Sequence, residues 1–275
     1  MSFLSYITWS PSPDIFSFGI ITLKWYSLMF ALTFFMGFMI ISKIFDNERK
    51  NIDDVFALAA YVFIGTVIGA RLGHCLFYEP EYYLSNPAEM LKVWKGGLAS
   101  HGGAIGILLA IRAFTKRKKY YSFIWLVDRV VIVVALGGLF IRTGNFFNSE
   151  ILGKPTDLPW AVVFSLFDNL PRHPSMLYEA FVYFGIFIFL YRKYLKEKFS
   201  PKPGMLFGLF LVLIFSARFL IEFTKEYQSA FEANLPIDMG QILSLPFIIA
   251  GIVIIFLSKK GRFQPKCKKK VIRSC

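Results

Sequence analysis

Cysteine and histidine are scarce in this chain of 275 residues, which holds only three of each. Cys75 lies in an apolar stretch, and Cys267 and Cys275 lie in a lysine-rich tail, so we expect no disulfide outside the cytoplasm. The histidines stand on different segments without the short spacing of metal ligands. We therefore predict neither a disulfide-stabilised fold nor a metal site, and we do not expect the chain's own thiols to carry its chemistry.

Positive charge is absent from residues 1–18, and polar residues are sparse throughout. A cleavable signal peptide begins with a positively charged region, so we expect the first apolar run to remain as a membrane span. Hydrophobic residues make up 56% of the chain, which contains 32 Phe and has a mean hydropathy of +0.54. This composition excludes an ordinary soluble domain.

Seven apolar runs are long enough to cross a hydrocarbon layer, which needs about 20 residues. They cover residues 19–42, 55–79, 97–114, 123–144, 175–191, 204–223 and 240–258. We predict an all-α, polytopic integral membrane protein with seven transmembrane helices. A single transmembrane domain would occupy residues 1–258, with a long external loop at 145–174 between helices four and five, and residues 259–275 would form a basic cytoplasmic tail.

The net charge of +13 is distributed unevenly. Of the 31 Lys and Arg, 21 lie in alternate connectors and in the tail, whereas five lie in the connectors of the opposite side. By the positive-inside rule, the N-terminus is expected outside and the tail in the cytoplasm. Anionic lipids of the inner leaflet are the expected partners of the basic loops and tail, and nucleic acid is not.

The segment 140–153 closes an apolar run with Arg142 and then carries two glycines, two asparagines and a glutamate. An arginine at the end of a span can simply extend to the interface, and that reading stays open when Arg142 is considered alone. Glycine lets the backbone approach a ligand closely, and side-chain amides fix polar groups where a helix has ended. We therefore interpret this segment as part of a site in which the helix ends at residue 144.

Four unusual polar residues converge on one depth when they are placed at 1.5 Å per residue. His101, Arg218, Arg142 and Tyr26 fall about 6, 8, 3 and 10 Å inside the outer ends of their spans. A base, two guanidinium groups and a phenol would therefore meet near the headgroups of the outer leaflet. Permanent cations at this depth indicate an anionic ligand, and a phospholipid phosphate is the abundant one.

Two of these residues also have a structural interpretation. Arg218 and Glu222 are four residues apart on one span, so they can neutralise each other. A lone histidine such as His101 is usually a structural residue, although its flanking glycines favour an accessible ring that could act as a base.

These residues resemble the prolipoprotein diacylglyceryl transferase family. The resemblance runs from Trp25 to Gly251, and its most specific part is the family signature Gly-Arg-x-Gly-Asn-Phe-x-Asn-x-Glu followed by Gly. The signature is matched by Arg142, Gly144, Asn145, Phe146, Asn148, Glu150 and Gly153. Further matches are His101-Gly102-Gly103, His173-Pro174-Ser175 with Tyr178-Glu179, Arg218-Phe219 with Glu222-Phe223, and Met239-Gly240-Gln241. Two departures are Ile141 in place of the first glycine and Lys225 where the family usually has a second arginine.

The resemblance implies a bacterial inner-membrane transferase whose active site faces the outer leaflet. The enzyme would move a diacylglyceryl group from phosphatidylglycerol to the thiol of the lipobox cysteine of a prolipoprotein, the first step of bacterial lipoprotein maturation, without a cofactor. It implies that His101, Arg142 and Arg218 are catalytic, and that the residues binding substrate include Arg142, Tyr26, Asn145, Asn148, Glu150, Gly153 and Glu222. The alternative is a membrane transporter or a phospholipid-binding scaffold without covalent chemistry, since charges inside a membrane also mark transport paths.

Overall fold

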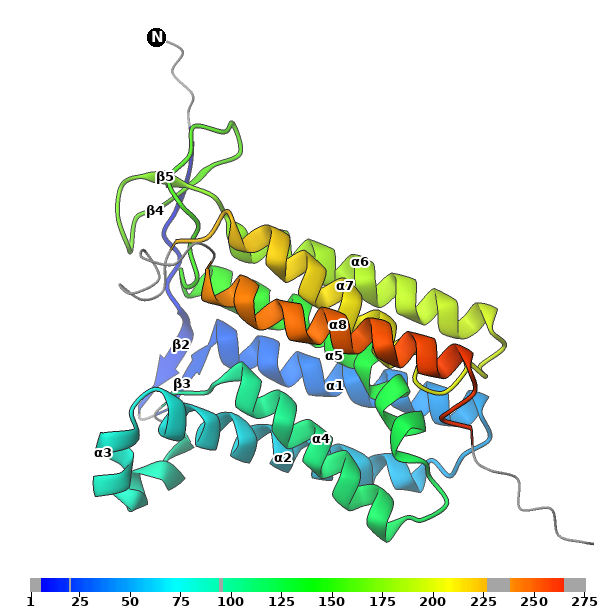
Figure 1. Ribbon diagram of the computed structural model, residues 1–275. Coiled ribbons are helices and arrows are strands. Elements are labelled where there is room, and N and C mark those ends of the chain that lie inside the picture. Colours follow the sequence, from blue (N-terminus) through cyan, green and yellow to red (C-terminus); the bar gives the residue numbers. More distant parts are fainter. Residues whose placement is uncertain (1–5, 20, 94–95, 227–237, 265–275) are drawn as a thin grey trace, which may run out of the picture.

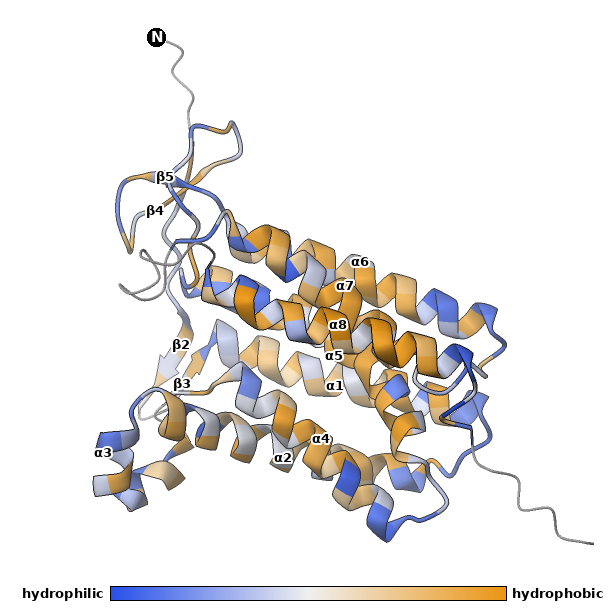
Figure 2. Ribbon diagram, viewed as in Figure 1, coloured by the Kyte–Doolittle hydropathy of each residue, from blue (hydrophilic) through white to orange (hydrophobic). Residues whose placement is uncertain are grey.

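The computed structural model describes residues 6–19, 21–93, 96–226 and 238–264, and within them seven long helices run side by side (Figure 1). The long helices are α1 (Trp25–Asn47), α2 (Asp53–Phe77), α4 (Ser100–Arg117), α5 (Phe123–Phe147), α6 (Ser175–Lys196), α7 (Met205–Glu222) and α8 (Met239–Lys259). Figure 2 shows apolar residues along the middles of these helices and hydrophilic residues gathered towards the ends. This distribution is that of a bundle whose outer surface faces hydrocarbon.

Six of these helices are long and apolar enough to cross a membrane: α1, α2, α5, α6, α7 and α8. The predicted mostly helical, polytopic membrane architecture is confirmed to this extent. Helix α4 is not among the six, and its 18 residues include the polar start Ser100-His101 and three cations in its last two turns, Arg112, Lys116 and Arg117.

The first span begins later than predicted, because the residues before it form a hairpin. Strand β2 (Asp14–Phe18) pairs with β3 (Ile21–Lys24) in an antiparallel manner, and the backbone N–H of Trp25 donates to the carbonyl of Pro13. Helix α1 therefore starts at Trp25 and not at residue 19. A short apolar run suits a strand as well as a helix, which is why periodicity did not separate the two.

The predicted end of the fourth span at residue 144 was also wrong. Helix α5 continues to Phe147, and the backbone N–H of Asn148 donates to the carbonyl of Gly144. Asn145 is therefore a helical residue, and the external loop begins at Asn148. Gly144 is needed for contact rather than for a turn, since a Cβ there would lie 2.9 Å from Cδ2 of Tyr26.

The long loop after α5 folds into a small sheet with the start of the chain, so the all-α prediction holds for the bundle and fails here. Strands β1 (Ile7–Trp9), β4 (Val162–Phe164) and β5 (Pro171–Arg172) lie in the order β1-β4-β5, with β1 parallel to β4. The Trp9 ring stacks on Phe146 at 4.1 Å, and its Nε1 donates to the Phe146 carbonyl at 3.0 Å. This contact fixes the loop over the end of α5.

Helices α2 and α4 pack with their backbones in contact. A Cβ on Gly69 would lie 2.4 Å from the carbonyl oxygen of Gly102, and a Cβ on Gly102 would lie 2.2 Å from that of Gly69. The glycines of α2 therefore serve helix packing. Gly102, beside His101, has the same purpose.

A short helix and a 3₁₀ segment project beyond the outer end of this pair, at α3 (Pro80–Ser85) and η1 (Pro87–Leu91). Arg71 holds them in place: its guanidinium donates to the carbonyls of Glu89, Met90 and Gly96 at 2.6–3.1 Å. The backbone carbonyls thus satisfy the hydrogen-bond donors of the buried Arg71 in place of a carboxylate.

Polar groups at the opposite end of the bundle are structural. Asp128 accepts hydrogen bonds from the backbone N–H groups of Gly204 (2.6 Å) and Phe207 (2.8 Å) at the start of α7. Arg129 pairs with Glu48 at 2.9 Å. Asp128 and Arg129 are neighbours in sequence, but the closer ion-pair partner of Arg129 is Glu48.

Candidate active site

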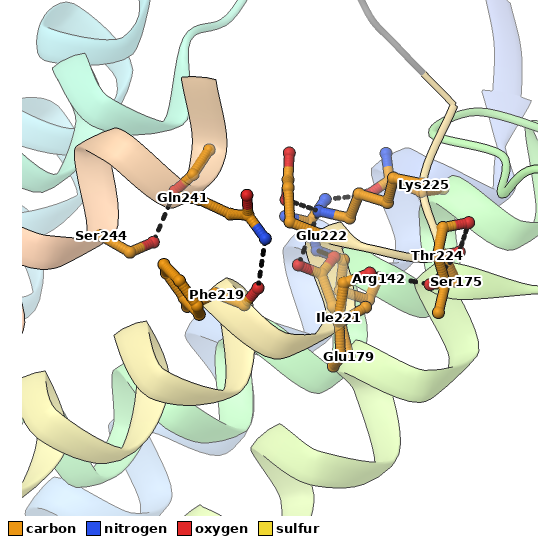
Figure 3. Close-up of polar contacts among 12 residues, drawn as sticks. Arg142, Ser175, Glu179, Phe219, Ile221, Glu222, Thr224, Lys225, Gln241 and Ser244 are labelled. Atoms are coloured by element: carbon orange, nitrogen blue, oxygen red, sulfur yellow. Dashed lines mark hydrogen bonds and ion pairs between the residues drawn. The ribbon is translucent and has the colours of Figure 1, made fainter. Parts of the chain in front are cut away.

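Four charged side chains with alternating signs meet at the end of the bundle where α5 ends, α6 begins and α7 ends (Figure 3). Nε of Arg142 lies 2.6 Å from Oε2 of Glu179, whose Oε1 lies 3.0 Å from Nζ of Lys225. Nζ of Lys225 also lies 2.9 Å from Oε2 of Glu222. The order is therefore Arg142, Glu179, Lys225, Glu222, and the four charges cancel.

Glu179 is the centre of this chain of ion pairs. Its side chain is fully buried, and Oε1 also accepts a hydrogen bond from the hydroxyl of Tyr183 at 3.3 Å. A carboxylate in such a place is tolerated only when cations and donors surround it. Glu179 thus anchors both Arg142 and Lys225.

Arg142 is also joined to the end of its own helix. Its Nη1 donates to Oδ1 of Asn145 at 3.0 Å, and Nδ2 of Asn145 donates to Oε2 of Glu150 at 2.9 Å. Asn148 donates to the other oxygen of Glu150 at 3.2 Å. The structure therefore brings together Arg142, Asn145, Asn148 and Glu150 of the predicted substrate-binding set.

Arg218 behaves differently from the other cations. The sequence offered Glu222 as its partner at i, i+4, but Glu222 pairs with Lys225. Within the described residues, Arg218 makes no hydrogen bond or ion pair. The self-neutralising pair considered from sequence is therefore absent from this part of the chain, and the guanidinium of Arg218 is available to a ligand.

Glu222 is held from a second side by α8. A Cβ on Gly240 would lie 2.3 Å from the carboxyl carbon of Glu222, so only glycine fits there. The side chain of Gln241 donates to the carbonyl of Phe219, and Asp238 and Gln241 form a capping box at the start of α8. The motif at 239–241 therefore fixes α8 against the end of α7.

Gly153 has a structural position in the outer loop. A Cβ there would lie 2.5 Å from Oγ of Ser175 and 2.4 Å from the carbonyl oxygen of His173. Its backbone N–H donates to that carbonyl at 3.0 Å, and it forms an isolated bridge with Lys225. Gly153 thus ties the loop to the segment that carries Lys225.

His101 lies nearer the surface than predicted. Helix α4 begins at Ser100, so His101 is its second residue and is exposed, whereas the sequence placed it about 6 Å inside the span. It has no hydrogen-bond partner in the described part of the chain. The charge of Arg218 acts on its ring, which places the two residues in one electrostatic environment.

A cavity of about 380 Å³ begins at this group of residues and continues into the bundle. Tyr26, Arg142, Tyr183 and Arg218 contribute its polar wall, and most of the remaining lining is apolar. Along α1 the lining runs from Tyr26 to Ile41, which at 1.5 Å per residue is about 22 Å. The cavity thus combines a polar end that carries two guanidinium groups with a long apolar interior.

Residues 13–257 of the chain match the prolipoprotein diacylglyceryl transferase family. The chain belongs to this family. It is 51% identical to the phosphatidylglycerol–prolipoprotein diacylglyceryl transferase of Chloroherpeton thalassium over 256 residues, which are 93% of this chain and 96% of that protein. The transferase of Tolumonas auensis is 50% identical over 92% of this chain and 98% of its own length, and that of Porphyromonas gingivalis is 39% identical over 97% and 99%. The resemblance inferred from motifs is confirmed.

Sequence reasoning about this diacylglyceryl transferase missed three residues that the structure places in the cluster. Glu179, Tyr183 and Lys225 were not among the predicted site residues, although Glu179 belongs to a matched motif. A signal existed for Glu179, because an acid about one turn inside an apolar helix calls for a cation. The pairing of Lys225 with two carboxylates required the tertiary structure. In the described residues, no three His, Cys, Asp or Glu side chains group to hold a metal ion.

Proposed function

We propose that this protein transfers the diacylglyceryl group of phosphatidylglycerol to the thiol of the lipobox cysteine of a prolipoprotein. The products are a thioether-linked lipoprotein precursor and glycerol phosphate. The observation that carries the proposal is the cavity, which has an apolar interior and, at its polar end, an arginine without an ion pair among the described residues. Membership of a transferase family in which curated relatives carry this activity in their names agrees with it.

In this proposal, phosphatidylglycerol binds with its phosphate at Arg218 and Arg142. Arg218 has no hydrogen bond or ion pair among the described residues, and Arg142 is held beside it by Glu179 and Asn145. Charge-assisted hydrogen bonds from a planar guanidinium suit a phosphate. The acyl chains occupy the apolar part of the cavity, beside residues such as Phe30, Phe34 and Ile107.

The reaction is a displacement at carbon. The cysteine thiol loses its proton, the sulfur attacks the terminal glyceryl carbon of the diacylglyceryl group, and the bond from that carbon to the phosphate oxygen breaks. The electron pair of this bond leaves with glycerol phosphate, whose added negative charge Arg142 and Arg218 stabilise. A thiol has a pKa of about 8.5, so a base accelerates the first step.

His101 is the proposed proton acceptor. It is exposed at the start of α4, and its neighbour Ser100 lines the cavity. A peptide thiol arriving from outside can therefore reach the imidazole while the lipid occupies the interior. Tyr26 and the amides of Asn145 and Asn148 complete the polar wall, and Gly153, Glu150 and Glu222 support it.

We further propose that α4 is a seventh span and that the site faces the outer leaflet of the bacterial inner membrane. Helix α4 lies against α2 over its length, as Figure 1 shows, and its cations fall at the end where the other basic connectors lie. The excess of Lys and Arg at that end assigns it to the cytoplasm, where anionic lipids are its partners. The N-terminus and the loop at 148–174 are then external.

The test is a transfer assay with the purified protein, phosphatidylglycerol and a lipobox peptide with a free cysteine. The expected result is a peptide heavier by one diacylglyceryl group, with release of glycerol phosphate and no transfer in Arg218→Ala. A lipid-binding scaffold or transporter would bind phosphatidylglycerol without consuming it. That outcome would reject the proposed activity.

A further inference from the structure

Lys225 occupies a buried position between two carboxylates. Its side chain is 2% exposed, and Nζ lies 3.0 Å from Glu179 and 2.9 Å from Glu222. Figure 3 shows it reaching from the segment after α7 back over the end of that helix. A compact ammonium can contact both acids at once, which is the geometry seen.

The backbone around Lys225 fixes this position. The N–H of Lys225 donates to the carbonyl of Glu222, and Lys225 forms an isolated bridge with Gly153. Next to this bridge, the backbone N–H of Lys154 donates to the carbonyl of Thr224. Lys225 is therefore placed by the outer loop and not only by its own ion pairs.

The pairing of Glu222 with Lys225 changes the surroundings of Arg218. At i, i+4 on one helix, Arg218 and Glu222 would ordinarily pair, yet Glu222 turns to Lys225 and no ion pair of Arg218 exists in the described residues. Arg142 and Lys225 engage both Glu179 and Glu222, so of these three cations Arg218 is the one without an ion pair in the described residues, beside the cavity.

We propose that Lys225 is a positioning residue for substrate binding: it occupies Glu222 and thereby keeps Arg218 unpaired for the lipid phosphate. This inference rests on the proposed function. Without the ammonium group, Glu222 has no cation of its own and captures Arg218, so the site loses its free positive charge. Lys225 acts through Arg218 and has no contact with the reacting atoms in this scheme.

The experiment compares four proteins in the transfer assay: wild type, Lys225→Met, Lys225→Arg and Lys225→Met with Glu222→Gln. KM is measured separately for phosphatidylglycerol and for the lipobox peptide. We expect Lys225→Met to raise KM for phosphatidylglycerol about tenfold or more, because one charged contact is lost, while KM for the peptide stays unchanged. Lys225→Arg keeps the charge and should remain close to wild type.

The double variant decides the mechanism. Removing the charge of Glu222 as well leaves Arg218 free again, so KM for phosphatidylglycerol should be at least about threefold lower than in Lys225→Met. A double variant as impaired as Lys225→Met would overturn the proposal, and so would a wild-type KM in Lys225→Met. If neither variant folds, as judged by size-exclusion chromatography, Lys225 serves folding and the assignment is rejected. Absence of transfer by wild type would instead reject the proposed function.

Discussion

The two arginines of the cavity illustrate what residue types alone can predict. Arg142 and Arg218 were both identified from sequence as cations at one depth. The structure separates them, because Arg142 is held by Glu179 and Asn145 whereas Arg218 has no partner among the described residues. The contact of Arg142 with Glu179 joins two helices, and a contact between residues distant in sequence has no signature in a single sequence.

Replacing Arg142 by lysine should cause a large loss of activity. Arg142 uses Nε towards Glu179 and Nη1 towards Asn145, and a lysine has a single nitrogen that cannot serve both and also reach a phosphate. We expect kcat/KM to fall by a factor that corresponds to about 2–3 kcal/mol of lost transition-state stabilisation. This is the value of a charged hydrogen bond. The measurement is peptide lipidation at several phosphatidylglycerol concentrations.

Arg117→Lys is the matched control for this substitution, since Arg117 is exposed at the C-terminal end of α4, opposite the end that carries His101. It should retain the wild-type rate. Equal activity of Arg142→Lys and Arg117→Lys would remove Arg142 from the site and return it to the role of an arginine that extends to the interface.

At the scale of elements, apolar periodicity located the helices but not what lies at their ends. The hairpin before α1, the strands β4 and β5 and the extension of α5 to Phe147 were all missed. Strand β4 depends on a contact distant in sequence with β1, which no local pattern encodes, whereas the hairpin is local and its short apolar run also suits a helix. The glycines of α2, four residues apart, are a local signal of close helix packing, but they do not indicate that α4 is the partner.

The α2–α4 contact gives a prediction about stability. Gly102→Ala places a Cβ 2.2 Å from the backbone oxygen of Gly69, and backbone cannot yield cheaply, so we expect a loss of about 1–3 kcal/mol. Gly103→Ala, one residue along the same helix, meets nothing nearer than 3.6 Å and should be tolerated. Thermal unfolding in detergent compares the two, and equal melting temperatures would contradict the backbone contact.

The outer sheet should loosen in acid. Asp168 bonds Arg172 of β5 at 2.9 Å, and this hydrogen bond lowers the pKa of the Asp168 carboxyl below its ordinary value. A lowered pKa means that the stabilisation is complete above the unfolded pKa of about 3.9 and is lost as pH falls through the folded value. Hydrogen exchange of residues 162–172 should therefore accelerate in that acidic window.

In Asp168→Asn, hydrogen exchange of residues 162–172 should already be fast at neutral pH. The pH dependence described above should therefore disappear. Asp157→Asn is the control, because Asp157 is exposed in the same loop and makes no ion pair within the described residues. An acid response unchanged in Asp168→Asn would assign the loosening to other carboxylates.

At the scale of the whole molecule, the seven long helices of the described chain alternate in direction, so all basic connectors fall at one end and the candidate site falls at the other. The orientation of the protein in the membrane can therefore be tested at two positions, one at each end of the bundle. The outer position suggested by the structure is Asp157, which is exposed in the loop after α5, and the inner one is Lys119, which is exposed between α4 and α5. Ser149 and Ser258 are less suitable, since the hydroxyl of Ser149 is buried and Ser258 is 2% exposed.

Single cysteines at these two positions, in a chain without Cys75, Cys267 and Cys275, should react oppositely with a membrane-impermeant thiol reagent. Asp157→Cys should be labelled in intact spheroplasts, and Lys119→Cys should be labelled only after the membrane is opened. The reason is the charge distribution: a cytoplasmic tail and an odd number of spans leave the loop outside. The same pair tests α4, because a helix that does not cross would put residues 80–91 and residue 119 on one side. A cysteine at Glu81, exposed in α3, completes the set: labelling of Glu81→Cys together with Lys119→Cys in intact spheroplasts would reject the seventh span.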